Sequence, residues 1–207
     1  MSRGKFITFE GGEGVGKSTN VAFVESYLQS KAIPVVVTRE PGGTKLAEKL
    51  RALLLDKKSE AITEEAELLL MFAARSQHLK HVIEPALARG DWVICDRFTD
   101  ATYAYQGGGR NMKISTIEGL ENLIQGNLRP DLTLLLDAPV KVGMERVGKR
   151  GAFDRFESET LQFFEDVRRA YLLQAELNPK RITLIKASQP LAEVQQAIIT
   201  VLSPLLR

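Results

Sequence analysis

The sequence predicts a three-layer α/β fold, in which helices cover both faces of a five-stranded parallel sheet. Short, nearly continuous apolar runs alternate with longer segments of helical periodicity. The connections between these runs are long enough for the helical crossovers that parallel strands require. The chain has 207 residues, of which 44% are hydrophobic, enough for one core and too few for two comfortable domains. We therefore expect one domain over residues 1–207.

The expected strands are rich in β-branched and apolar residues, as strands covered on both faces should be. They span residues 5–10, 33–38, 92–98, 132–137 and 182–187. After each of the first two strands, apolar residues recur at helical spacing and predict a helix with one face in the core. The residues of these two stripes are Val21, Val24 and Leu28, then Leu46, Leu50 and Leu53.

Capping residues predict where two further helices begin. Thr63 precedes a run of glutamates, so a helix should begin after it and run towards Pro85. Ser115 and Glu118 have the spacing of a capping box, which predicts a helix from there through Leu123.

Three other stretches complete the outline. Residues 191–203 are amphipathic ahead of Pro204 and predict a C-terminal helix. Residues 106–111 and 147–153 are rich in glycine and basic residues. We expect both to be irregular, flexible loops that handle anions.

Composition limits the class of partner. Twenty-eight basic and 26 acidic residues give a net charge of +2, which does not favour a nucleic-acid-binding protein. The single cysteine, Cys95, excludes an intrachain disulfide and favours a reducing compartment. No apolar run approaches the ~20 residues that span a bilayer, and no signal peptide is recognisable. We expect a cytoplasmic protein with small anionic ligands and neither nucleic-acid nor membrane partners.

The segment FEGGEGVGKST, residues 9–19, matches the phosphate-binding pattern G-x-x-x-x-G-K-[ST] between a predicted strand and a predicted helix. Glycines let backbone N–H groups wrap phosphates, and the helix N-terminus and Lys17 add positive charge. The hydroxyl of Ser18 is placed to reach Mg²⁺. The expected ATP contacts in this loop are Gly11, Gly12, Glu13, Gly14, Val15, Gly16, Lys17, Ser18 and Thr19.

A glycine loop of this kind serves both kinases and hydrolytic switch proteins. A GTPase-type switch should carry N-K-x-D and D-x-x-G, and neither string occurs in the sequence. A kinase that acts on a small acceptor is therefore favoured.

Three arginines are candidates for binding the acceptor. Ligands of open parallel sheets bind beyond the carboxyl ends of the strands. Arg39 follows the predicted strand 33–38, and Asp96 and Arg97 lie near the end of the predicted strand 92–98, so all three should lie at the same edge as the glycine loop. Arg75 follows an apolar helical run, and from spacing alone it could equally be a solvated helix residue.

Six segments together closely resemble bacterial thymidylate kinases. They are FEGGEGVGKST (9–19), TREPGGT (38–44), LLLMFAAR (68–75), CDRF (95–98), TYAYQGGGR (102–110) and GAFDRFE (151–157). TREPGGT and AYQGGGR are quite specific to that family, whereas adenylate and uridylate kinases would share only the architecture. The resemblance implies transfer of the ATP γ-phosphoryl to dTMP, giving dTDP and ADP for dTTP synthesis. It also implies Mg²⁺ and a homodimer.

The resemblance implies how dTMP is held. Arg39 and Arg97 would hold its phosphate, and Arg75 would hydrogen-bond thymine. In many relatives the stacking aromatic residue lies four positions before that arginine, a place taken here by Met71. Phe72 is one position later, and we select Phe72 as the stacking residue.

The resemblance also assigns the sugar and the base edge. Thr102 and Gln106 would read the edge of thymine, and Tyr105 would fill the place of a ribose 2′-hydroxyl. Glu13 would point out of the phosphate loop and accept a hydrogen bond from the 3′-hydroxyl of dTMP. This would explain a carboxylate within a phosphate-binding loop.

The acceptor is already a phosphate dianion, so the reaction needs positioning and charge neutralisation more than a general base. We expect Lys17, Arg97 and Glu13 to be catalytic, with Ser18 and Asp96 near Mg²⁺. His78 and His81 are expected to be structural or solvated, Cys95 to lie in the core and Asp137 to be structural.

The resemblance adds a short mobile lid, about residues 146–156, that closes over ATP and supplies a catalytic arginine. Arg146 and Arg150 are our choices for ATP contacts, and Arg150 for catalysis. Related lids often read R-x-R-x-R, whereas here Gly148 takes the middle place. Lys149 and Arg155 therefore remain alternatives.

Overall fold

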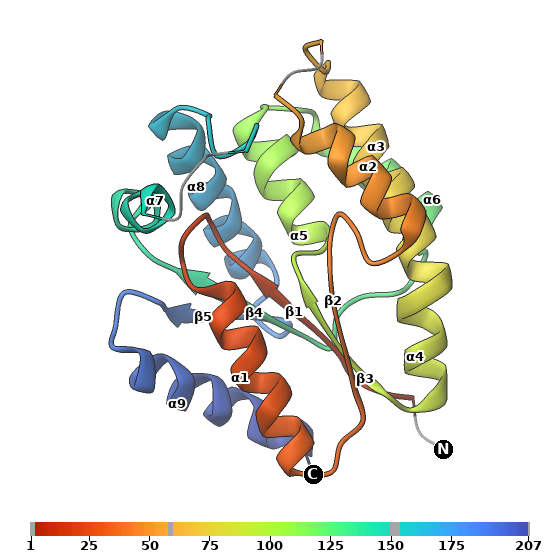
Figure 1. The fold of residues 1–207 in the computed structure, drawn as a ribbon, viewed down its shortest axis with the longest axis vertical. Helices are drawn as coiled ribbons and strands as arrows, with labels where there is room; N and C mark the ends of the chain where they lie inside the picture. Colours follow the sequence, from red (N-terminus) through yellow and green to blue (C-terminus); the bar gives the residue numbers. More distant parts are fainter. Residues whose placement is uncertain (1–2, 58–59, 150–153, 207) are drawn as a thin grey trace.

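The computed structural model describes residues 3–57, 60–149 and 154–206. Within them, five parallel strands form one sheet in the order β2-β3-β1-β4-β5, as Figure 1 shows, which confirms the predicted fold class. Each strand lies within two residues of its predicted bounds. The strands are β1 (Phe6–Glu10), β2 (Val35–Arg39), β3 (Trp92–Asp96), β4 (Leu132–Asp137) and β5 (Ile182–Lys186).

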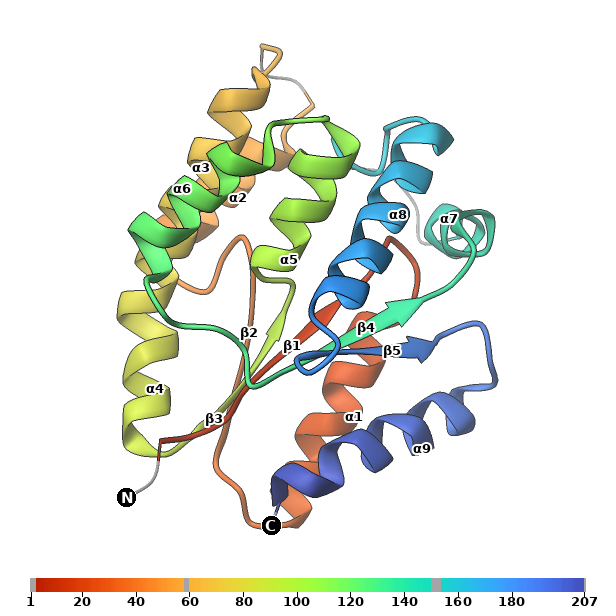
Figure 2. The ribbon, with the colours of Figure 1, turned by 180° about the vertical axis from the view of Figure 1, so that it is seen from behind.

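Helices cover both faces of the sheet (Figures 1 and 2). On one face lie α1 (Lys17–Ser30) and α9 (Leu191–Leu202), followed by a 3-10 turn, Ser203–Leu206. On the other lie α3 (Glu64–His78), α4 (Glu84–Arg89), α5 (Thr99–Thr102), α6 (Ile114–Gln125) and α8 (Leu161–Leu177). Helix α2 (Lys45–Leu55) packs on α3, and α7 (Val140–Gly148) follows β4. No helix in the described ranges is long and apolar enough to cross a membrane.

The two predicted apolar stripes had different outcomes. Val21, Val24 and Leu28 are buried on α1, as predicted. The second stripe is wrong, because Leu46 and Leu53 are 49% and 53% exposed. The buried residues of α2 are instead Ala47 and Leu54, one position later along the helix. A leucine-rich helix offers more than one apolar face, and packing on α3 selects between them.

Of the two predicted helix starts, one is confirmed and the other is wrong. Thr63 does cap α3, since its hydroxyl accepts a hydrogen bond from the Ala66 N–H at 3.3 Å. The capping box at Ser115 is wrong, because α6 begins at Ile114 and Ser115 lies inside its first turn. The long helix also passes Pro85 rather than stopping there. A π-helical segment, Leu79–Ile83, joins α3 to α4, and its wider turn relieves the clash between proline and the preceding turn.

The glycine run at 107–109 is helical, which corrects our expectation of a flexible loop. Tyr103–Gly109 forms a second π-helical segment that packs on α8. A Cβ added to Gly108 would lie 2.6 Å from the Cβ of Ala170, and one on Gly109 would lie 2.4 Å from the Phe163 ring. These glycines therefore permit close packing. In the other expected loop, Val147 and Gly148 belong to α7, whereas 150–153 lie outside the described residues.

Candidate active site

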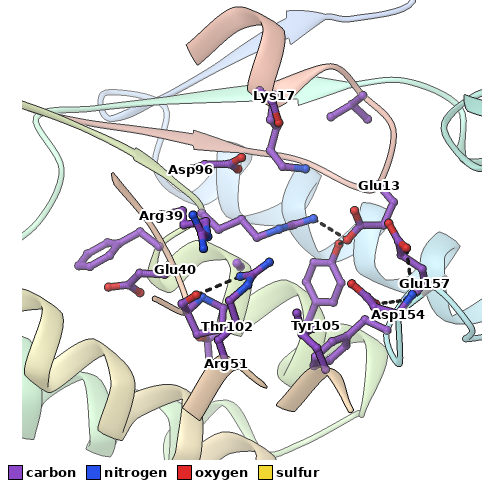
Figure 3. A pocket seen from close by; sticks show the side chains of 18 of the residues that line it. Glu13, Lys17, Arg39, Glu40, Arg51, Asp96, Thr102, Tyr105, Asp154 and Glu157 are labelled. Carbon is purple, nitrogen blue, oxygen red and sulfur yellow. Dashed lines mark hydrogen bonds and ion pairs between the residues drawn. The ribbon is translucent and has the colours of Figure 1, made fainter. Parts of the chain in front are cut away.

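A cavity of about 540 Å³ lies at the glycine loop and the carboxyl end of β3 (Figure 3). It extends to side chains of α2, α3 and the π-helical segment Tyr103–Gly109. Most residues singled out from the sequence line it. They are Glu13, Gly14, Val15, Gly16, Lys17, Ser18, Thr19, Arg39, Arg75, Asp96, Arg97, Thr102, Tyr105, Gln106 and Arg146. Gly11 and Gly12 instead line a small adjoining hollow with Asp137.

The glycine loop is held in shape by a contact with α7. Gly14 has a φ of +67°, and a Cβ there would lie 2.0 Å from the carbonyl oxygen of Gly143. Conversely, a Cβ on Gly143 would lie 2.2 Å from the carbonyl oxygen of Glu13. The backbones of loop and helix thus meet where any side chain would separate them.

Lys17 is folded back onto the loop. Its Nζ donates hydrogen bonds to the carbonyl oxygens of Gly12 at 2.7 Å and Gly11 at 3.1 Å, and the residue is only 8% exposed. Burial, together with the nearby charge of Arg97, lowers the pKa of Lys17 to about 8. An incoming phosphate would offer this amine the negative charge that the carbonyl groups lack.

Glu13 joins the glycine loop to the opposite wall. Its Oε1 accepts hydrogen bonds from Arg97 Nη2 at 2.6 Å and from the Tyr105 hydroxyl at 2.9 Å. Figure 3 shows the Glu13 and Tyr105 side chains meeting. Burial alone would disfavour the charge of Arg97, but Glu13 raises the pKa of that guanidinium well above its ordinary value. Burial raises the pKa of Tyr105, so its hydroxyl remains a donor.

The backbone of Arg97 is itself unusual. Its φ is +66°, a left-handed conformation that costs a residue with a side chain about 1 kcal/mol. Hydrogen bonds on both sides hold it there, from the Arg97 N–H to the Phe9 carbonyl and from the Phe98 N–H to Glu10 Oε1. This turn directs the guanidinium back over the glycine loop, where Nη1 donates to the Gly11 carbonyl at 3.0 Å.

Arg75 is buried at the α3 side of the cavity. Its Nε donates to Glu40 Oε2 at 2.7 Å, and its Nη2 donates to Thr102 Oγ1 at 3.0 Å and to the Phe98 carbonyl at 3.2 Å. The remaining nitrogen, Nη1, is buried and has no hydrogen-bond partner among the described residues. Because Arg75 lines the cavity, a ligand there can satisfy this donor.

The structure places Phe72 differently from our expectation. Phe72 is 2% exposed and packs in a cluster with Leu68 and Ile117, outside the cavity wall. Its ring lies under the guanidinium of Arg75, 4.8 Å from its central carbon. Met71, one position earlier on α3, lines the cavity instead. The choice of Phe72 over Met71 as the residue against the base is therefore not supported by the geometry.

Other candidates lie at the edges of the site. Arg39 is half-exposed and bonded to Glu48 at 2.9 Å. Arg146 donates to the Gly14 carbonyl at 3.3 Å. Arg155, an alternative lid arginine, points away, with bonds to the Leu54 carbonyl and Glu67. Arg150 lies outside the described residues.

Sequence reasoning missed several cavity residues, among them Glu40, Arg51, Asp154 and Glu157, which Figure 3 labels. Glu40 stood inside the motif TREPGGT and could have been found there. Arg75 and His78 hold the pKa of this carboxyl below its ordinary value, although burial opposes them. His78 joins Glu40 to Thr38 by hydrogen bonds and is fully buried, so it is structural.

This parallel sheet, with a phosphate-binding loop and the side chains of Arg39, Arg75 and Arg97 lining one cavity, defines a P-loop kinase of small phosphorylated acceptors. Comparison with known proteins specifies the family. The family model described as thymidylate kinase matches residues 9–198. The chain belongs to the thymidylate kinase family.

Individual relatives agree with this assignment. The chain is 59% identical to a thymidylate kinase of Teredinibacter turnerae over 195 residues, which cover 94% of the chain and 95% of that protein. It is 57% identical to one from Methylococcus capsulatus, over 100% and 98% of the two chains. A solved thymidylate kinase structure from Ehrlichia chaffeensis superposes with a TM-score of 0.78 at 34% identity, covering 97% of this chain and 99% of that one.

Proposed function

We propose that this thymidylate kinase transfers the γ-phosphoryl of ATP to dTMP, giving dTDP and ADP, in one domain. The observation that carries the choice of acceptor is the pair of polar groups at the α3 side of the cavity. Arg75 Nη1 is a buried donor that has no partner within the part of the chain that the structure describes. The amide nitrogen of Gln106 donates a hydrogen bond to Glu67 at 2.8 Å, so the carbonyl oxygen of Gln106 can accept a hydrogen bond from a ligand.

This pair matches thymine and not cytosine. Thymine presents a carbonyl at C4 and an N–H at N3, which suit Arg75 and Gln106 respectively. Cytosine presents an amine at C4 and an unprotonated N3, so both groups would face the wrong partner. A site that leaves buried polar groups unpaired rejects such an analogue strongly. Met71 and Thr102 would complete the wall around the base.

The sugar would lie between Tyr105 and Glu13. Tyr105 is held in place by its hydrogen bond to Glu13 and by the guanidinium of Arg97, 4.8 Å from the centre of its ring. This fixed ring would take the space of a 2′-hydroxyl and favour the deoxy sugar. The Glu13 carboxylate would accept a hydrogen bond from the 3′-hydroxyl.

The phosphates would meet between the glycine loop and the two strand-end arginines. ATP phosphates would lie on the N–H groups of residues 11–19 and draw Lys17 away from the Gly11 and Gly12 carbonyls. The acceptor phosphate would lie between Arg39 and Arg97. Negative charge on the transferred group would be stabilised by Lys17, Arg97 and the lid arginines Arg146 and Arg150.

Mg²⁺ fits the residues present. Asp96 lines the cavity, and its Oδ1 is buried with no hydrogen-bond partner in residues 3–57, 60–149 and 154–206. Ser18 lines the same cavity. No cluster of three or more His, Cys, Asp or Glu side chains that could hold a metal occurs in the described ranges. This suits Mg²⁺, which takes one or two protein ligands and completes its shell with phosphates and water. When bound, it would neutralise charge on the ATP phosphates.

We further propose a cytoplasmic homodimer. Cys95 is buried and free, as suits a reducing compartment.

Exposed leucines occur on α2, α3 and α6, which are neighbours in Figures 1 and 2. They are Leu46, Leu53, Leu69 and Leu123. A second copy would cover them. Light scattering should give twice the monomer mass for the wild type and a lower mass for Leu69→Lys.

The test of function is ADP release from Mg-ATP with dTMP, dUMP, dCMP, UMP, AMP, CMP and GMP offered separately. A blank without acceptor gives the background hydrolysis. We expect dTMP to give the highest kcat/KM. A higher value for another monophosphate would reject the proposed base contacts, and hydrolysis without any acceptor requirement would favour a switch protein.

A further inference from the structure

Glu67 is a buried carboxylate behind the base pocket that is not itself part of the cavity wall. It lies on α3, eight residues before Arg75, and is 1% exposed. Four hydrogen bonds converge on it. Its Oε1 accepts from Gln106 Nε2 at 2.8 Å and Arg110 Nε at 3.4 Å, and its Oε2 from Arg155 Nη2 at 2.6 Å and Arg110 Nη2 at 3.3 Å.

The chemistry of this contact fixes the Gln106 side chain. An amide can donate through its nitrogen or accept through its oxygen, and the two ends have nearly the same shape. An ionised carboxylate only accepts hydrogen bonds. Glu67 therefore forces the nitrogen of Gln106 towards itself, and the carbonyl oxygen is the end that can meet a ligand. Gln106 is 1% exposed, so the end of the amide that faces Glu67 is shielded from solvent, and a reversed orientation there would be costly.

We propose that Glu67 is a positioning residue that sets the preference for thymine over cytosine by fixing the orientation of the Gln106 amide. This role rests on the proposed function, because it requires the base to lie against Gln106. The carbonyl oxygen of Gln106 accepts from N3–H of thymine and opposes the lone pair on N3 of cytosine. If the amide turned over, its nitrogen would instead donate to N3 of cytosine and clash with N3–H of thymine.

Arg155, near the end of the predicted lid, links Glu67 to the end of α2. It donates to Glu67 through Nη2 and to the Leu54 carbonyl, at the end of α2, through Nε. Arg110 has a second carboxylate partner, Glu159, at 2.6 Å. Neutralising Glu67 therefore deprives Arg155, more than Arg110, of its carboxylate.

The primary test is Glu67→Gln, with Glu65→Gln as its matched control. Glu65 lies on the same helix and is exposed, so the control removes the same charge without touching Gln106. The readouts are the Kd values of dTMP and dCMP from calorimetry and the kcat and KM for dTMP. A glutamine at 67 can accept or donate, which frees the amide to turn. We expect the dCMP-to-dTMP ratio of Kd to fall about tenfold, KM to rise and kcat to stay within about threefold.

A double-mutant cycle separates this role from general packing. In a Gln106→Ala background, Glu67→Gln should leave the Kd ratio unchanged, because there is no amide to orient. An equal fall in both backgrounds would overturn the role, as would a Glu67→Gln ratio that matches Glu65→Gln.

A charge-balanced pair covers the case in which Glu67→Gln does not fold. The double variant Glu67→Gln with Arg155→Gln also removes the cation that would otherwise lose its carboxylate partner. Arg155→Gln alone is the reference for this variant. We expect Arg155→Gln alone to keep the wild-type dCMP-to-dTMP ratio of Kd. In the double variant, this ratio should fall about tenfold. Equal ratios in the two would overturn the role. A wild type that binds dTMP no better than dCMP would instead reject the proposed function, and this role with it.

Discussion

Arg97 and Glu13 form an ion pair of 2.6 Å across the cavity, each side chain 17% exposed. The pair joins the end of β3 to the middle of the glycine loop, and Tyr105 donates to the same Glu13 oxygen. The carboxylate in this phosphate-binding loop therefore holds Arg97 and Tyr105 in place. Under the proposed function, it would also meet the sugar of the acceptor.

Glu13→Gln tests both roles. An amide keeps the shape but holds Arg97 less firmly, so we expect kcat/KM for dTMP to fall about 10- to 100-fold. Discrimination against the 3′-deoxy analogue of dTMP should shrink by about tenfold, since a lost buried acceptor is worth about 1 to 3 kcal/mol. Steady-state kinetics with both acceptors measures this. Equal discrimination by the two enzymes would remove the sugar contact.

Lys17→Ala should abolish most turnover without unfolding the protein. The ammonium group is the full positive charge of the phosphate loop, and we expect kcat to fall at least about 10³-fold. Lys49→Ala, on the exposed surface of α2, is the control. The thermal midpoint of each variant shows whether the fold survives, and near-normal turnover by Lys17→Ala would contradict the proposed chemistry.

The lowered pKa of Lys17 predicts a pH effect on ATP binding. With a pKa of about 8 in the free enzyme, Lys17 is charged below that pH and loses its charge as the pH rises through it. ATP phosphates stabilise the charged form, so KM for ATP should rise above pH 8. Binding near pH 8.5 should also take up protons. Calorimetry in buffers of different ionisation enthalpy measures the uptake, and a value of zero would be inconsistent with a buried, partly neutral Lys17.

Alanine substitutions at two glycines of α7, Gly143 and Gly148, test whether the contact between α7 and the glycine loop matters apart from the helix propensity of alanine. Gly143→Ala would push its Cβ into the Glu13 carbonyl, so we expect a loss of about 1 to 3 kcal/mol and a weaker affinity for ATP. A Cβ on Gly148 would meet no atom of the described residues within 4 Å, so Gly148→Ala should be neutral or slightly stabilising. Thermal unfolding and ATP titration measure the stability and the ATP affinity of both variants. Equal values for the two variants would show that the contact of Gly143 with Gly14 is unimportant.

Met71 and Phe72 should differ in what they control. Met71→Ala removes a side chain from the cavity wall, and we expect KM for dTMP to rise several-fold with a small change in stability. Phe72→Ala empties a core site beneath Arg75 and should cost about 3 to 5 kcal/mol of stability. Kinetics and thermal unfolding of the two variants distinguish them. A Phe72→Leu variant that keeps its thermal midpoint but loses dTMP affinity would restore Phe72 to the base site.

The sheet, the phosphate loop and most of the cavity residues could be predicted from the sequence alone. Strand signals are local, since apolar runs and their flanking turns persist whatever packs on them. The motif from Gly11 to Ser18 requires only its own strand and helix. Arg39 and Arg97 could be placed together because the carboxyl ends of parallel strands meet at one edge. The family resemblance added Thr102, Tyr105 and Gln106, all of which line the cavity.

Tertiary structure decided which faces of the helices are used and how the polar groups pair. Leucine spacing did not show that Ala47, and not Leu46, is buried on α2. Motif spacing did not show whether Met71 or Phe72 lines the cavity. Neighbouring residues on a helix point in different directions, and tertiary packing decides which direction faces the core or the site. The contacts of Glu67 with Gln106 and Arg155, and of Glu40 with Arg75, join residues at least 35 positions apart. A buried charge is tolerated only where such distant partners meet it, so its role is set by the assembled fold.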